Sequence, residues 1–260
     1  MDSPIEVINL YSGSGGNSTY VRTPDGEFLI DAGKSCCALK KALNEIGTDI
    51  SKIKAIFITH EHGDHISALK TLLKKNDLPI HAEDASAEHI FIATGKRECV
   101  FGHSACFSIE FDNTVFTSFE TSHDSFGCVG YRVDYSLNDK RFSFGIATDT
   151  GYVTEGMKDG LCGCDTVILE CNHDVDMLCG GVYPDILKKR ILSRKGHLSN
   201  DACAEFARYL SRCGTKQIML AHLSKDNNIP SLARACVENA LCDTDTRVLV
   251  AKQSEITRFD

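Results

Sequence analysis

A dense group of possible metal ligands stands in the run Thr-His-Glu-His-Gly-Asp-His, directly after the apolar segment at residues 53–58. The group is formed by His60, His62, Asp64 and His65. An imidazole offers one nitrogen lone pair and a carboxylate offers two oxygens, so such a turn can serve two divalent ions. The helical His-Glu-x-x-His motif of zinc proteases does not fit, because the glutamate lies between two histidines and a glycine interrupts any helix there. The run therefore predicts a metal site rather than a polar loop with chance histidines.

Three further candidates each follow a segment that reads as a strand. They are His123 in Thr-Ser-His-Asp-Ser, Asp149 in Ala-Thr-Asp-Thr-Gly and His222 in Leu-Ala-His-Leu. A rigid scaffold can aim the loops at strand ends toward one shared site. Alone, each residue would more often be a hydrogen-bonded loop residue, but the first motif favours a common metal centre. Asp-Thr-Gly also occurs in aspartic proteases, whose chemistry needs two such motifs, and this chain has one.

Two other segments could contact an anionic substrate. The Gly-rich run at residues 12–17 resembles a phosphate loop, but strand-like residues follow it, so no helix N-terminus is available to bind a phosphate. It is either a hairpin turn or a turn that also lines the site through Asn17. A basic run could track a phosphate polymer or could be a solvated helix face. It consists of Lys188, Lys189, Arg190, Arg194 and Lys195.

Composition narrows the class of protein. The 260 residues, 42% of them apolar, suffice for one large α/β domain, and we expect a single domain over residues 1–260. No apolar run approaches the roughly 18 residues of a membrane span, and the start Met-Asp-Ser-Pro-Ile-Glu lacks the features of a signal peptide, so we expect a cytoplasmic protein without a membrane partner. The 13 cysteines follow no zinc-ribbon or disulfide pattern, which predicts reduced thiols. The net charge of −8 argues against nucleic-acid binding through bulk positive charge, although it allows a local basic track.

The elements that must position these residues follow from hydrophobic periodicity and from turn residues. Strands are predicted at residues 5–10, 19–21, 28–30 and 53–58, then from 107 to 147, and at 167–169, 217–220 and 248–251. Helices are predicted at residues 38–46, 66–74, 85–94, 184–192, 200–213 and 231–241. Two blocks of strands, each with its own helices, predict an α/β fold in which two mixed sheets pack face to face between helices, a four-layer αββα sandwich.

Taken together, the motifs resemble those of the YycJ (WalJ) group of metallo-β-lactamase-fold hydrolases. The resemblance runs from about Val7 to His222. It rests on the Ser-Gly-Ser-Gly-Gly-Asn turn, His-x-His-x-Asp-His, Glu-Cys-Asn-His-Asp, Gly-Val-Tyr-Pro and Gly-His-Leu-Ser-Asn. It implies that His60, His62 and His123 hold one divalent ion and that Asp64, His65 and His222 hold another, with Asp149 bridging them. Zn, Mn or Fe would suit these ligands.

This group is related to tRNase Z and the β-CASP nucleases, which implies a second pair of functional residues. Glu170 and His197 match a carboxylate and a histidine that lie near the scissile phosphate in those enzymes. A histidine held by a carboxylate has a fixed orientation and a raised tendency to carry a proton, so His197 could protonate a leaving alkoxide or bind a phosphate oxygen. The alternative is a structural hydrogen bond at a helix N-terminus. His173 is either a substrate contact or a loop histidine satisfied locally beside Asp174.

The residues predict hydrolysis of a phosphodiester, and the family resemblance implies, more specifically, an exonuclease of DNA or RNA linked to DNA maintenance. A hydroxide between two ions would attack phosphorus in line, with Asp64, Glu170 and His197 as the catalytic set. An alternative is thioester or lactone hydrolysis of the glyoxalase II kind, against which Glu170, His197 and the basic run argue. β-Lactam hydrolysis fits less well. A non-catalytic nucleic-acid-binding module is a different class of alternative, which the complete set of ligands disfavours. The oligomeric state is not predicted.

Overall fold

The computed structural model describes residues 4–138 and 140–259, and within them the strands form two seven-stranded mixed sheets. The first sheet has the order β14 (Thr257–Arg258), β1 (Glu6–Tyr11), β2 (Ser18–Thr23), β3 (Gly26–Ile30), β4 (Ile53–Phe57), β5 (Ile80–Glu83) and β6 (Val100–His103). The second has the order β13 (Arg247–Val250), β12 (Gln217–Ala221), β11 (Thr166–Glu170), β10 (Lys140–Ala147), β9 (Val129–Leu137), β8 (Thr114–Glu120) and β7 (Ser108–Phe111). The ends of the predicted domain, residues 1–3 and 260, lie outside the described residues.

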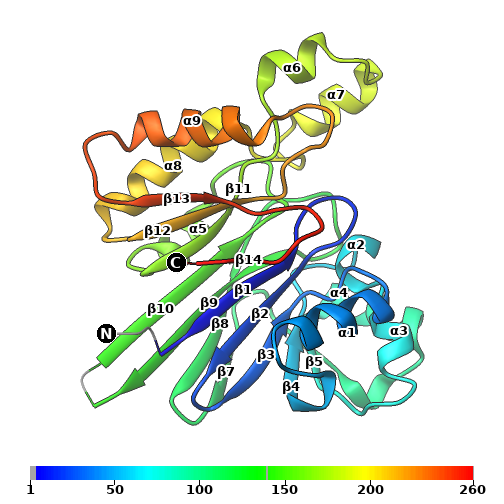
Figure 1. Cartoon of the computed structure of the whole chain (residues 1–260). Helices are drawn as coiled ribbons and strands as arrows, with labels where there is room; N and C mark the ends of the chain where they lie inside the picture. Colours follow the sequence, from blue (N-terminus) through cyan, green and yellow to red (C-terminus); the bar gives the residue numbers. More distant parts are fainter. Residues whose placement is uncertain (1–3, 139, 260) are drawn as a thin grey trace.

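Helices cover the outer face of each sheet (Figure 1). The first sheet carries α1 (Cys36–Glu45), α3 (Leu69–Leu72) and α4 (Asp84–Thr94), with short 3₁₀ turns at Ile50–Lys52 and Arg97–Cys99. The second carries α5 (Glu155–Leu161), α8 (Asn200–Arg212) and α9 (Pro230–Ala240). Leu39 and Leu43 on α1, for example, pack against Ile56 of β4, because apolar residues at helical spacing form one face. The predicted four-layer sandwich is confirmed.

A third apolar cluster fills the space between the two sheets. Phe57 of β4 and Phe116 of β8 stack with their ring centroids 4.0 Å apart. Tyr131 of β9 is buried among them, and its hydroxyl donates to the carbonyl of Ile58, two residues before His60. Burying a tyrosine requires a partner for its hydroxyl. This bond therefore fixes the end of β4, from which the first ligands extend, against the opposite sheet.

The strand directions place many carboxyl-terminal strand ends at one edge of the sandwich. In the first sheet β3, β4, β5 and β6 are parallel, and in the second β10, β11, β12 and β13 are parallel. Two successive antiparallel pairings also give β8 the direction of β10. Loops after parallel strands emerge on the same side of a sheet. The loops after β3, β4, β8, β10, β11 and β12 therefore meet there.

Two short helices, α6 (Val175–Gly180) and α7 (Asp185–Ile191), stand away from both sheets between β11 and α8 (Figure 1). We call residues 174–196 the arm. Leu178 is the buried residue of α6, while α7 contains none. Val182 between them is 95% exposed. The arm is thus held by its two ends and by polar contacts rather than by a core of its own.

The structure corrects the prediction of one helix at residues 66–74, where α2 (Gly63–Ile66) and α3 (Leu69–Leu72) lie instead. The carbonyl of Asp64 accepts from the backbone N–H of Asn17, and the backbone N–H of Ala68 donates to Ala32. In a continuous helix the N–H of Ala68 would donate to the carbonyl of Asp64, but here both groups bond to other parts of the chain, and the helix is interrupted. Several short elements, among them β5, β6, α5 and α6, were not predicted. Among the described residues no helix is both long and apolar enough to cross a membrane.

Candidate metal centre

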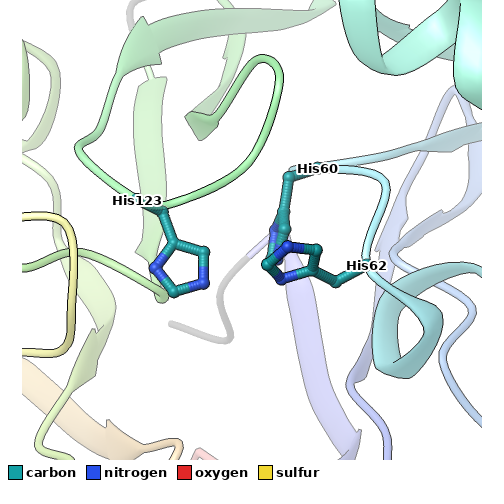
Figure 2. A group of neighbouring side chains, drawn as sticks. All are labelled: His60, His62 and His123. Carbon is teal, nitrogen blue, oxygen red and sulfur yellow. The ribbon is translucent and has the colours of Figure 1, made fainter. Parts of the chain in front are cut away.

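The first group of predicted ligands, His60, His62 and His123, comes together from two loops, one from each sheet. His60 follows β4, His62 precedes α2, and His123 lies in the loop after β8. The three rings converge (Figure 2), and one ligand atom from each lies within 4.8 Å of the others. Nδ1 of His123 donates to the carbonyl of Gly196 at 3.1 Å. Nε2 is consequently the nitrogen of His123 that remains free for a metal.

Asp64, His65 and His222 form a second group whose ligand atoms also lie within 4.8 Å of one another. The carboxylate of Asp149 lies between this group and the first. Its oxygens are 3.3 Å from Nε2 of His65, 3.5 Å from Nε2 of His222 and 3.8 Å from Nε2 of His123. All seven predicted ligands are therefore brought to one place, with Asp149 central.

Buried atoms without partners test whether these residues suit a metal. Nε2 of His60, Nε2 of His222 and Oδ2 of Asp149 are buried and have no hydrogen-bond partner within the described residues. An unsatisfied buried polar atom costs about 1–3 kcal/mol. Cations in the two ligand groups would satisfy these atoms, and mixed imidazole and carboxylate ligation suits divalent transition metals. The residues present thus fit a divalent metal cofactor.

Electrostatics at the centre also favour a cation. Burial lowers the pKa of His65, but Asp31 and Asp149 more than offset burial and raise this pKa to about 10. Burial likewise lowers the pKa of His222, while Asp149, Asp64 and Glu170 bring it well above its ordinary value. The pKa of Asp149 lies well below its ordinary value, because His222 and His65 outweigh its burial. The buried carboxylates therefore create a negative potential that attracts positive charge.

Asp31, which follows β3, is a functional residue that the sequence reasoning missed. Its Oδ2 accepts from Nδ1 of His65 at 2.8 Å, and its Oδ1 accepts the backbone N–H of Thr59 at 2.9 Å. The bond to Nδ1 turns Nε2 of His65 toward Asp149. Asp31 stands directly after a strand, as the predicted ligands do, so the same signal could have identified it.

The Gly-rich turn lies behind the metal ligands. Asn17 is 6% exposed, and its side-chain amide donates to Oδ2 of Asp64 at 3.2 Å and lies 3.0 Å from Nε2 of His65. The hydroxyl of Ser12 accepts the backbone N–H of His222 at 2.7 Å. These contacts orient ligands. The predicted contact between Asn17 and a substrate stays a prediction.

Glu170, at the end of β11, holds two histidines. Its Oε1 accepts from Nδ1 of His197 at 2.7 Å and from Nδ1 of His222 at 3.0 Å, while its Oε2 accepts the backbone N–H of Thr150. Glu170 is fully buried, but His197 and His222 outweigh the effect of burial and lower its pKa to about 2. Burial lowers the pKa of His197, and Glu170 more than reverses this to give a raised pKa. The Glu170–His197 pair predicted from the family resemblance is present beside Asp149.

His173 is 1% exposed, and neither ring nitrogen has a hydrogen-bond partner within the described residues. Burial lowers its pKa to about 4. It lies beneath the surface between Glu170 and the start of α8, and its backbone carbonyl accepts the N–H of Asn200. Local satisfaction of its ring by Asp174, the alternative interpretation, is not observed. The predicted contact with substrate stays a prediction.

The basic run lies on α7 and on the segment that leads to His197. Lys188 donates to the carbonyl of Cys179, and the guanidinium of Arg194 lies 3.7 Å from the centroid of the Tyr152 ring. Arg190 is paired with Asp124, the residue after His123. Lys189 and Lys195 are exposed. The run is therefore a set of individually placed side chains rather than one continuous stripe, and Arg190 is the member linked to the metal centre, through Asp124.

Two further acidic residues at the centre were missed. Glu61, inside the first motif, is buried and accepts from the backbone N–H of Phe126 at 3.1 Å and from the hydroxyl of Ser86 at 2.6 Å. It thereby ties the loop that carries His123 to the loop that carries His60. Asp124 lies against His123, with Oδ1 3.3 Å from Nε2. Neither residue has a sequence signal apart from its position beside a ligand.

Comparison with known proteins agrees with this fold. Residues 27–223 match the model of the β-lactamase superfamily domain. Exodeoxyribonuclease YycJ of Bacillus anthracis is 37% identical over 237 residues, which cover 89% of this chain and 87% of that protein. Exodeoxyribonuclease WalJ of Streptococcus pneumoniae is 37% identical over 255 residues, which cover 92% and 89%. The crystal structure of the metallo-β-lactamase fold protein YhfI from Bacillus subtilis superposes with a TM-score of 0.73 at 19% identity, covering 99% of this chain and 100% of that chain.

The family match spans the ligand motifs from the loop after β3 to His222, and the similarity to YycJ and WalJ extends over most of both chains. The chain therefore belongs to the β-lactamase superfamily and, within it, to the metallo-β-lactamase-fold family that includes the YycJ and WalJ exodeoxyribonucleases.

Proposed function

We propose that this chain is a metal-dependent phosphodiesterase that degrades DNA or RNA as an exonuclease. The observation that carries the proposal is the position of His197, held by buried Glu170 at the rim of a centre with seven imidazole and carboxylate ligands. The names of the similar proteins YycJ and WalJ, both exodeoxyribonucleases, support DNA as the substrate. A role in DNA maintenance is part of the same proposal. Two divalent ions, of Zn, Mn or Fe, would occupy the two ligand groups.

Such ions would supply an activated water and would neutralise charge on the phosphate oxygens. The remaining chemistry belongs to the chain. Glu170 accepts from Nδ1 of His197, so Nε2 is the ring position available to the substrate. The carboxylate raises the pKa of His197, which favours the imidazolium form. His197 would then donate the proton on Nε2 to the departing oxygen, while Asp64 would help His65 and His222 to hold the second ion.

Lys189 and Lys195 are exposed on the arm beside the centre, and with Arg190 and Arg194 they would contact successive phosphates. The two sheets share one apolar interior, which supports the proposal that residues 1–260 act as a single domain. A cytoplasmic location with reduced cysteines is part of the same proposal.

The test uses DNA and RNA oligonucleotides labelled separately at the 5′ and 3′ ends, incubated with Mn²⁺ or Zn²⁺. Asp149→Asn should abolish cleavage, and His197→Ala should slow it by about 10²- to 10⁴-fold with metal binding retained. Asp159→Asn, on the exposed face of α5, is the matched control and should cleave like wild type. The order in which labelled products appear gives the polarity. Oligonucleotides that stay intact with every metal would contradict the proposal, and thioester hydrolysis would be assayed next.

A further inference from the structure

Asp124 occupies an unusual position between a metal ligand and the arm. One carboxylate oxygen lies 3.3 Å from Nε2 of His123, the nitrogen that faces His60 and His62. The other oxygen accepts from Nε of Arg190 on α7. The side chains of Asp124 and Arg190 are 28% and 55% exposed, so the pair lies open to a ligand at the rim of the first ligand group.

The loop that carries Asp124 is anchored on both sides. Glu61 accepts the backbone N–H of Phe126 at 3.1 Å, and the carbonyl of Ser122 accepts the backbone N–H of Gly151 at 2.8 Å. The hydroxyl of Ser122 also donates to the carbonyl of Arg194 at 2.8 Å. These bonds, the last of them to the C-terminal end of the arm, give Asp124 a defined position that does not depend on α7.

Arg190, in contrast, lacks support from packing, because no residue of α7 is buried. Its pairing with Asp124 is the contact that directs the guanidinium toward the metal centre. Lys188, two residues earlier on α7, instead donates to Cys179 within the arm. A guanidinium has five N–H donors in a planar fork, so binding through Nε leaves the terminal nitrogens free for another oxyanion.

We propose that Asp124 is a positioning residue that holds Arg190 beside the His60–His62–His123 group so that the guanidinium binds a backbone phosphate of the substrate. This inference rests on the proposed function. Because Arg matches the geometry of phosphate oxygens in a bidentate manner, a guanidinium held in place binds phosphate with better geometry than a freely moving one. Asp124 would therefore improve nucleic-acid binding although it carries a negative charge.

The sign of that effect separates positioning from bulk electrostatics. Removing an acidic side chain near a polyanion should strengthen binding if only net charge matters. If Asp124 positions Arg190, Asp124→Ala should instead weaken binding of a fluorescein-labelled single-stranded DNA by about 3- to 10-fold, and Arg190→Ala should weaken it at least as much. Asp124→Asn keeps an acceptor oxygen and should fall between Asp124→Ala and wild type.

The experiment measures DNA binding by fluorescence anisotropy without metal, and KM and kcat with Mn²⁺, for wild type, the single variants and the double variant Asp124→Ala/Arg190→Ala. We expect the double variant to match Arg190→Ala alone, with the change mainly in KM, because one residue acts through the other. Asp243→Ala, which breaks the exposed Arg208–Asp243 pair on the other side of α8, is the matched control and should change neither value.

Titration calorimetry with Mn²⁺ tests whether Asp124 itself binds the metal. We expect Asp124→Ala to keep the Mn²⁺ affinity and stoichiometry of the wild type. DNA binding that is equal to or tighter than wild type in Asp124→Ala would overturn the inference, as would additive losses in the double variant or a lower Mn²⁺ affinity. If the wild-type protein neither cleaves nor binds nucleic acid, the proposed function itself is overturned. That failure is distinguishable from failure of the inference about Asp124, because it is seen with the wild-type protein alone.

Discussion

Asp149 and Glu170 are both fully buried carboxylates, but they contact different nitrogens of the surrounding imidazoles. Asp149 lies against Nε2 of His65 and of His222, whereas Glu170 accepts from Nδ1 of His222 and of His197. Asp149 is therefore placed to bind a metal together with these Nε2 atoms, whereas Glu170 orients the rings of His222 and His197 through their Nδ1 atoms. Asp31 does the same for His65. An acceptor at Nδ1 keeps the proton of a neutral imidazole on Nδ1, so that the lone pair on Nε2 is available to the metal.

At this scale we predict that Asp31→Asn weakens metal binding by about 10- to 100-fold, as is typical when a partner of a metal-binding histidine is lost. Asparagine tolerates the positive φ of 62° at this position, so the change acts through chemistry rather than backbone strain. The amide nitrogen of the asparagine would replace the oxygen that accepts from Nδ1 of His65, so two N–H donors would face each other and the hydrogen bond would be lost. Calorimetric titration with Zn²⁺ or Mn²⁺ measures the affinity.

Asp25→Asn is the control for Asp31→Asn. Asp25 lies in the turn between β2 and β3, at the far end of the same sheet, and accepts from Asn113 and Thr114. We expect this variant to lose stability but to keep its metal affinity. Equal loss of affinity in both variants would mean that general destabilisation, and not the orientation of His65, explains the result.

At the scale of elements, the ligand loop after β4 rests on the loop after β3. The backbone N–H of Ala32 donates to the carbonyl of His65, and that of Asn17 donates to Asp64, both at 2.8 Å. Gly33 permits this contact, since a Cβ at that position would lie 1.5 Å from the carbonyl oxygen of Asp64. The ligand turn is thus shaped by neighbouring backbone as much as by its own residues.

We predict that Gly33→Ala displaces the turn that carries Asp64 and His65 and destabilises the protein by roughly 2–4 kcal/mol, the range of a strained overpacking substitution. Metal affinity should fall as well. Gly180→Ala is the control, because a Cβ there meets no atom within 4 Å and the residue lies in α6. Urea denaturation monitored by circular dichroism measures both variants. A Gly33→Ala protein as stable as Gly180→Ala would contradict the close contact.

At the scale of the whole molecule, the metal centre joins the two sheets. His60, His62, Asp64 and His65 extend from the first sheet, whereas His123, Asp149 and His222 extend from the second. A ligand that binds the folded state and not the unfolded chain stabilises the fold in proportion to the logarithm of its concentration. An ion bound by both sheets therefore stabilises the sandwich as a unit.

We predict that chelation by EDTA lowers the melting temperature and that metal added at 100 times its dissociation constant restores about 2.7 kcal/mol per site. Differential scanning calorimetry at several metal concentrations measures the change. In Asp149→Asn the melting temperature should respond much less to metal, because the residue between the two groups is altered. A melting temperature that is independent of metal in the wild type would contradict binding across the sheets.

The candidate metal ligands and the layered fold could both be predicted from the amino-acid sequence. His60 to His65 form a motif over consecutive residues, and His123, Asp149 and His222 follow strands whose apolar residues are evident from the sequence. Such signals are local, so periodicity and spacing reveal them. β5 was missed because it contains only two apolar residues, Ile80 and Ala82, and α6 because its six residues span fewer than two helical turns. The break between α2 and α3 depends on Asn17 and Ala32, which are distant in sequence.

The way in which the candidate ligands are held depends on tertiary contacts. The partners of the imidazoles come from separate loops: Asp31 for His65, Gly196 for His123, and Glu170 for His222. The pairing of Asp124 with Arg190 joins residues 66 positions apart. No spacing along the chain encodes these pairs, because they arise where the ends of parallel strands from two sheets meet. The residue types set which chemistry is available, and the packing of the sheets set which atoms face one another.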